Sequence, residues 1–149
     1  MKQQYYIGLS LFITLIILIG DQLTKFIIRT QMTLGESFAV VPKFLYITSH
    51  RNNGAAWGIL SGKMTFFYII TIIVLIALIV FYIKEAKNNM LMQIAISLLF
   101  SGALGNFIDR VSSGEVVDFI DTVIFGYDFP IWSRLQVPLN HITHLLLRH

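Results

Sequence analysis

The sequence has no cysteine and little charge. Without cysteine, the chain can form no disulfide, no thiol nucleophile and no thiolate metal site of its own. Charged residues make up 13% of the 149 positions, compared with about 25% in a typical soluble domain. Hydrophobic residues make up 56%, and the mean hydropathy is +0.73. Lipid is therefore the expected solvent for much of the chain.

Several classes of function are disfavoured by what else is missing. The net charge of +3 comes from eleven basic and eight acidic residues, with no basic run, so we expect no nucleic-acid partner. The HExxH and GxSxG motifs are absent. Three histidines gather near the end, in a stretch without acids or cysteines to complete a metal site: His141, His144 and His149. We therefore expect no bound metal.

Three apolar segments are predicted to cross a membrane as helices, since a crossing needs about 20 mostly apolar residues. They cover about residues 5–26, 64–83 and 90–108. The first is interpreted as a retained helix, because no small-residue cleavage pattern follows it. In the third, Ser97, Ser101 and Gly105 have the small-xxx-small spacing that lets a neighbouring helix approach closely.

The connection between the first two spans is too polar to lie in lipid. Within it, "FLYIT" (residues 44–48) has β-branched and aromatic character and loose alternation, which predicts a short strand or hairpin on the membrane surface. Lys84 and Lys87 favour a cytoplasmic location for the short turn between the second and third spans. The first connection also carries basic residues, so charge alone does not fix the orientation: Arg29, Lys43, Arg51 and Lys63.

Polar residues near the span ends form two groups. Asp21 and Lys25 are spaced i, i+4, as in a helical ion pair at the membrane interface. Asn106, Asp109 and Arg110 share one helical face at the end of the third span. The second group is interpreted as an interfacial cap. Alternatively, the guanidinium fork of Arg110 holds a neighbouring loop or a substrate carbonyl.

Asp118 lies in an apolar strip, "GEVVDFID". Apolar surroundings favour the uncharged form of a carboxyl group, which can then act as an acid or base near neutral pH. A lone aspartate is more often structural, but two that share a proton can activate water, as in aspartic proteases. Asp121 and Asp128 lie nearby in sequence. We do not expect either to complete a pair, because a pair must be held by rigid elements.

Four motifs in order resemble the lipoprotein signal peptidase family (signal peptidase II, or prolipoprotein signal peptidase), in wording most like staphylococcal members: "DQLTK" (21–25), "NNGAAWG" (52–58), "GALGNFIDR" (102–110) and "VVDFI" (116–120). The resemblance covers about residues 1–131. It implies an all-α polytopic membrane protein with a small extracytoplasmic β-cradle, four transmembrane helices and both termini in the cytoplasm. It also implies a multi-pass aspartic endopeptidase of the bacterial cell membrane. Such an enzyme removes signal peptides from prolipoproteins before a diacylglyceryl-modified cysteine, with its active site on the extracytoplasmic face.

The resemblance also assigns roles to individual residues. Asp118 would be one of two catalytic aspartates. The residues that contact or shape the substrate site would be Asn52, Gly54, Asn106 and Arg110, and the structural residues would be Asp21, Lys25 and Asp109. No metal or organic cofactor is implied. The implied partners are lipid-modified prolipoproteins, membrane lipid and globomycin-type inhibitors.

The sequence departs from the family after Ile131. Gln136 stands where the second catalytic aspartate is expected, Ser133 stands where an asparagine is expected, and no fourth span follows. Residues 1–131 are therefore interpreted as a signal-peptidase-like membrane domain, and residues 132–149 as an atypical tail that arose by frameshift, truncation or a cloning artefact. Two alternatives remain open. One is a catalytically dead family member that still binds lipidated substrate, and the other is a small membrane transporter or channel subunit.

Overall fold

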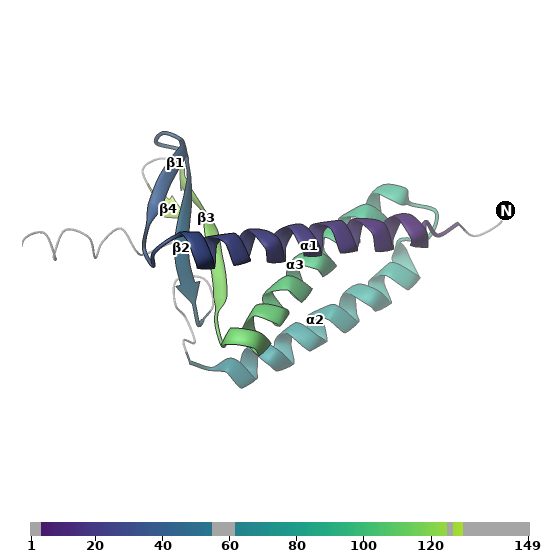
Figure 1. Cartoon of the computed structure of the whole chain (residues 1–149). Coiled ribbons are helices and arrows are strands. Elements are labelled where there is room, and N and C mark those ends of the chain that lie inside the picture. The colour runs from purple at the N-terminus through teal and green to yellow at the C-terminus, as the bar shows by residue number, and fades with distance from the viewer. Residues whose placement is uncertain (1–3, 55–61, 125–126, 130–149) are drawn as a thin grey trace, which may run out of the picture.

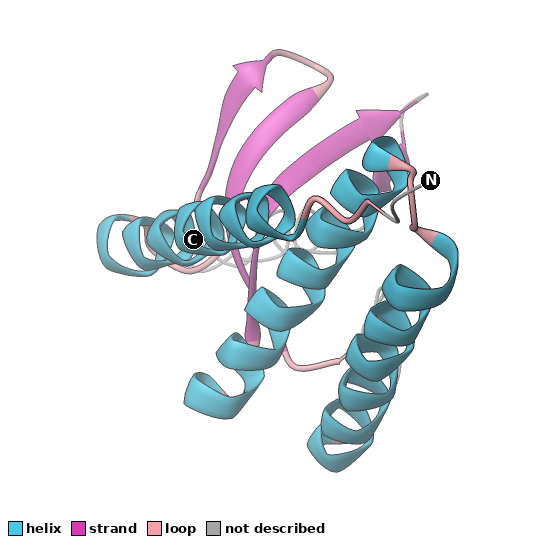
Figure 2. Cartoon of the chain, turned by 90° about the vertical axis from the view of Figure 1, so that its right-hand side faces the viewer, coloured by secondary structure: helices cyan, strands magenta, loops and turns pink. Residues whose placement is uncertain are grey.

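A bundle of three helices carries an antiparallel sheet across one of its ends (Figure 1). The computed structural model describes residues 4–54, 62–124 and 127–129. Its helices are α1 (Ile7–Gln31), α2 (Met64–Glu85) and α3 (Met90–Ser113). Figure 2 views the molecule from the end opposite the sheet, with the helices in front and the strands behind them.

The three helices are long and apolar enough to cross a membrane, which confirms the predicted spans. Most of their large apolar side chains are exposed, as expected where lipid covers the protein. Two helices run further than predicted, since α1 ends at Gln31 rather than near residue 26 and α3 ends at Ser113 rather than near residue 108. The charged side chains of Lys25 in α1 and Asp109 in α3 pair with each other inside the bundle and do not mark the helix ends. Gly114 ends α3 with φ +74°, a left-handed conformation that favours glycine.

Helix α3 packs against both other helices. Ser97, Ser101 and Gly105 are all buried, which confirms the predicted close approach. Gly105 faces Asp21 of α1, and a Cβ atom at position 105 would collide with the Asp21 carboxylate. The absence of a side chain at Gly105 therefore makes room for a charged group between the two helices.

The bundle is tied together at the end away from the sheet by Gln93, which is only 1% exposed. Its Oε1 accepts hydrogen bonds from the Tyr6 backbone N–H (2.7 Å) and the Tyr82 hydroxyl (2.9 Å). Its Nε2 donates to the carbonyl oxygens of Ala86 (2.9 Å) and Gln4 (3.4 Å). One buried amide thus joins the start of the chain to the turn between α2 and α3.

The sheet has the order β1-β2-β3-β4, and all neighbours are antiparallel. The β1–β2 hairpin confirms the strands predicted after the first span. β3 is an inner strand, paired on both sides. In the β2–β3 register, His50 lies opposite Asp118 and Asn52 lies opposite Val116. The strands are β1 (Ser37–Val41), β2 (Leu45–Asn52), β3 (Val116–Ile124) and β4 (Tyr127–Phe129).

The predictions made for the tail fall on residues 132–149, which lie outside the described residues. They include the division at residue 131, the absence of a fourth span, and the assignments of Ser133 and Gln136.

Candidate active site

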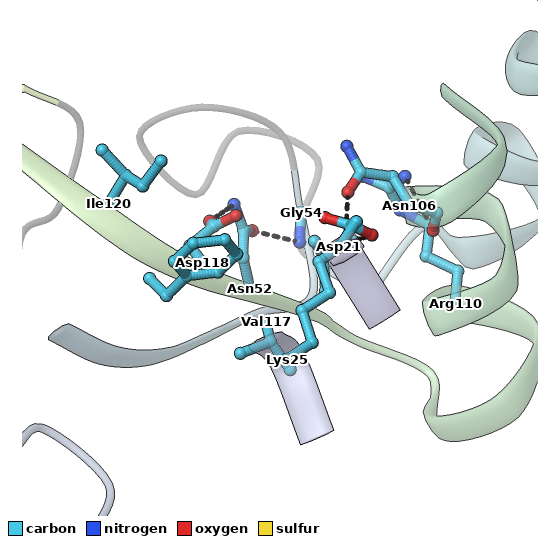
Figure 3. Close-up of a pocket in the computed structure, with 11 residues that line it drawn as sticks. Asp21, Lys25, Asn52, Gly54, Asn106, Arg110, Val117, Asp118 and Ile120 are labelled. Carbon is cyan, nitrogen blue, oxygen red and sulfur yellow. Dashed lines mark hydrogen bonds and ion pairs between the residues drawn. The ribbon is translucent and has the colours of Figure 1, made fainter. Parts of the chain in front are cut away.

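A cavity of about 430 Å³ lies where α1 and α3 meet β3 and the end of β2 (Figure 3). Apart from Asp109, every residue predicted for the site lines it. The remaining lining residues come from β3 and were not predicted. The predicted residues that line the cavity are Asp21, Lys25, Asn52, Gly54, Asn106, Arg110 and Asp118; those added by β3 are Val116, Val117, Phe119 and Ile120.

Asp118 projects from the inner strand β3 and is held by Asn52. The Asn52 Nδ2 donates to Asp118 Oδ2 at 2.8 Å, and the Gly54 backbone N–H donates to Asn52 Oδ1 at 2.8 Å. The register explains the contact, because Asn52 lies opposite Val116 and therefore shares a sheet face with Asp118, two residues further along. Among the described residues, no hydrogen bond reaches the other oxygen of Asp118. One carboxylate oxygen is anchored and the other is open to the cavity.

Lys25 lies beside the cavity with 4% exposure. Its Nζ is 2.7 Å from Asp109 Oδ2 and 2.8 Å from Asp21 Oδ2, and it donates to Asn106 Oδ1 at 3.0 Å. The predicted Asp21–Lys25 pair is therefore present, but it is part of a cluster that joins α1 to α3. An ammonium group has three N–H bonds, and here three oxygen atoms surround it.

Gln22 was missed from the sequence, and Gly105 was predicted as a helix-packing residue but not as a neighbour of Asp21. The Gln22 Nε2 lies within hydrogen-bond distance of Asp21 Oδ2 (3.1 Å), Asp109 Oδ1 (3.3 Å) and the Gly105 carbonyl oxygen (3.3 Å). Gly105 provides the space for Asp21. A signal for both was present, since Gln22 lies inside "DQLTK" and Gly105 lies in the small-residue pattern of α3.

Arg110 borders the cavity from α3. Its guanidinium carbon lies 4.8 Å from the centre of the Phe67 ring of α2, a cation–π contact. The Tyr68 hydroxyl donates to the Arg110 carbonyl oxygen at 3.0 Å, and the guanidinium attracts the Asp118 carboxylate electrostatically. Its Nε is buried and makes no hydrogen bond within the described residues. Arg110 therefore brings positive charge and N–H donors to the cavity that Asp118 also lines.

Asp121 is not part of this arrangement. It is three residues beyond Asp118 on one strand, so its side chain points to the opposite face of the sheet. It is 2% exposed and does not line the cavity. The side chain of Asp128 lies outside the described part of the chain.

Comparison with known proteins identifies the family. The family model described as signal peptidase (SPase) II matches residues 13–134, which is most of the chain. The chain belongs to the signal peptidase II family. This is a family of aspartic proteases, so the predicted family and enzyme class are confirmed.

Known signal peptidase II proteins resemble the chain over nearly its whole length. The lipoprotein signal peptidase of Staphylococcus haemolyticus is 70% identical over 152 aligned residues, 99% of this chain and 96% of that protein. That of Staphylococcus aureus MRSA252 is 69% identical over 133 residues, 89% of this chain and 82% of that protein.

Two solved structures are also similar to the chain over nearly its whole length. They are described as bacterial membrane enzymes, at 2.3 and 1.9 Å resolution. Both are 64% identical and cover 99% of this chain; their TM-scores are 0.81 and 0.78, and 93% and 98% of those chains are covered. None of these comparisons supports a transporter or channel.

Proposed function

We propose that the cavity around Asp118 is the active site at which this membrane aspartic endopeptidase removes signal peptides from prolipoproteins, before a diacylglyceryl-modified cysteine. One observation carries the assignment to this cavity. Asp118, anchored through one oxygen by Asn52, shares a cavity at the end of a membrane-spanning bundle with Asn106 and Arg110. The family match supplies the reaction class.

The chemistry is peptide hydrolysis. In an aspartic pair, the ionised carboxylate takes a proton from the attacking water while the protonated carboxyl group donates to the scissile carbonyl oxygen. Asn52 stabilises negative charge on Asp118 Oδ2 and leaves Oδ1 free to reach water or substrate. The position expected for the second carboxyl group is Gln136, outside the described residues. The rate at which this chain cleaves substrate therefore depends on which group takes the role of the second carboxyl group.

The walls of the cavity suit a lipidated peptide. Val116, Val117, Phe119 and Ile120 offer apolar surface, whereas Asn52, Gly54, Asn106 and Arg110 offer polar groups for a peptide backbone. The exposed apolar faces of the helices support a location of the cavity where lipid meets water, in which the acyl chains of a substrate can stay in the bilayer. We expect globomycin-type inhibitors to compete with substrate for this cavity.

We place the cavity on the extracytoplasmic face of the bacterial cell membrane. The α2–α3 turn with Lys84 and Lys87 lies at the opposite end of the bundle (Figure 1), and lysines in short loops favour the cytoplasm. The chain has no cysteine, so single cysteines can report the topology. In intact cells, a membrane-impermeant maleimide should label Lys43→Cys and not Lys87→Cys. The reverse pattern would contradict this orientation.

Cleavage of a diacylglyceryl-modified prolipoprotein by the purified chain in lipid tests the function. Asp118→Asn is expected to lower the rate at least about 100-fold, as typically follows loss of a general acid or base. Unchanged cleavage in Asp118→Asn would refute the assignment. If the parent does not cleave but a Ser133→Asn/Gln136→Asp variant does, the chain is a dead family member whose site at Asp118 is intact.

A further inference from the structure

Lys25 is positioned to fix the orientation of a neighbouring side-chain amide. Its Nζ donates to Asn106 Oδ1 at 3.0 Å, and the two other oxygen atoms near it belong to Asp21 and Asp109. The hydrogen bond to Asn106 therefore belongs to a buried ammonium that is also within ion-pair distance of two carboxylates. Lys25 therefore borders the cavity with its ammonium group turned to oxygen atoms of the protein.

The same contact determines which way the Asn106 amide points. An amide carries an acceptor oxygen on one side and two N–H donors on the other. If the amide were flipped, its N–H groups would face the Lys25 ammonium, donor against donor, and one ammonium N–H would lose its acceptor inside the protein. The oxygen therefore faces Lys25. Figure 3 shows the Asn106 nitrogen turned away from the dashed line that leaves its oxygen.

This nitrogen is unused among the described residues. Asn106 lines the cavity, and within the described segments its Nδ2 donates no hydrogen bond. Asn52 of β2 has a similar arrangement. Its Oδ1 accepts a hydrogen bond from the Gly54 N–H, and its Nδ2 donates to Asp118. Both asparagines thus have their oxygen anchored to the protein, and Asn106 keeps an N–H₂ group for a ligand.

We propose that Lys25 is a positioning residue, which orients Asn106 so that Nδ2 donates a hydrogen bond to a peptide carbonyl oxygen of the bound substrate. The proposal rests on the proposed function, because it requires a peptide in this cavity. Lys25 acts through Asn106 and does not touch the substrate itself. Asp21 and Asp109 also lie within ion-pair distance of the ammonium.

A double-mutant cycle on cleavage tests the coupling. Lys25→Met/Asp109→Asn removes the cation together with one of its two anions, so that fewer unpaired charges are buried, and Asn106→Leu removes the amide. Each is expected to lower kcat/KM by about tenfold, the value of one hydrogen bond. The combined variant is expected to be within about twofold of the worse one, because the two share a single lost contact. A roughly hundredfold loss, the product of the two effects, would overturn the proposal.

A second measurement needs neither cleavage nor substrate. The side-chain N–H₂ signals of ¹⁵N-labelled protein in detergent include that of Asn106, identified by its loss in Asn106→Leu. Lys25→Met/Asp109→Asn should shift or broaden this signal, because the amide is no longer held. The matched control is Gln22→Leu, which removes contacts to the same two carboxylates without touching Asn106, and it should leave the signal in place.

The two measurements separate this proposal from the proposed function. An Asn106 signal that is unchanged without Lys25 would overturn the positioning role, whether or not the chain cleaves. A signal that responds as expected, in a protein whose cleavage does not depend on Asp118, would instead refute the proposed active site. Variants are compared only after thermal unfolding shows that each is folded.

Discussion

Replacing Gly105 by alanine is expected to destabilise the protein and disturb the cavity. The new Cβ would collide with the Asp21 carboxylate, whose Oδ2 is held by Lys25 at 2.8 Å and by Gln22 at 3.1 Å. The carboxylate cannot move away without breaking those contacts. Inserting a methyl group into a packed interior costs about 1–3 kcal/mol.

Gly102 provides a matched control on the same helix. It is exposed, and nothing lies within 4 Å of a Cβ built there. Both substitutions gain about the same helix propensity, roughly 1 kcal/mol over glycine, so this term cancels in the comparison. At about 3 °C per kcal/mol for a chain of this size, Gly105→Ala should unfold about 3–9 °C below Gly102→Ala.

Thermal unfolding in one detergent at one heating rate measures the difference, with cleavage of a lipidated prolipoprotein assayed alongside. Gly105→Ala should also cleave more slowly, because Asp21 borders the cavity and shares Lys25 with Asn106. If the two variants unfold within about 2 °C of each other and cleave equally fast, α1 and α3 do not approach as closely as the contact requires.

Three further substitutions test other parts of the structure. Asn52→Leu should lower kcat/KM about 10- to 150-fold, because a hydrogen bond to a charged group contributes about 1.5–3 kcal/mol; an unchanged rate would show that Asp118 does not need this donor. Gln93→Leu removes four hydrogen bonds, worth about 0.6 kcal/mol each within a membrane, and should lower Tm by about 7 °C. At temperatures well below its Tm, Gln93→Leu should cleave at the parent rate, because Gln93 is far from the cavity. A slower rate at those temperatures would contradict this expectation. Arg51→Gln breaks a 3.5 Å ion pair with Glu115, whose side chain is 38% exposed. Exposed ion pairs contribute about 0–1 kcal/mol, so Tm should fall by at most about 3 °C. A larger fall would contradict the view that this pair contributes little.

The membrane spans could be predicted because apolar length is a local property of the sequence. Their ends could not. The interfacial ion pair expected at Asp21 and Lys25 marked the end of α1 near residue 26, yet the helix continues to Gln31. Lys25 contacts Asp109 and Asn106 on another helix and does not mark the end of its own. Such contacts between distant segments cannot be recognised from the residues around Lys25 alone.

The grouping of the predicted site residues was expected from the family resemblance. Asp118, Asn52, Asn106 and Arg110 come together in one cavity, as the order of the motifs implied. Gln22 and the contact of Gly105 with Asp21 were missed, because both depend on which faces of α1 and α3 meet. The side chain of Asp121 points away from the face of Asp118 because side chains alternate along β3. This orientation requires that the segment be a strand, and its pairing with both β2 and β4 shows that it is one.

The cluster around Lys25 also has a consequence for biosynthesis. Its acceptor on Asn106 lies 81 positions further along the chain. When α1 leaves the ribosome, its lysine has only Asp21 of the same helix as a partner, and a charged group without partners is costly inside lipid. The lysine end of α1 should therefore stay at the membrane surface until α3 has been inserted. In stalled nascent chains, a photocrosslinker at Leu23 should contact lipid headgroups before α3 emerges and acyl chains afterwards. The cavity also needs β3, which follows α3 in the chain, so a chain that ends before residue 120 lacks part of the cavity wall.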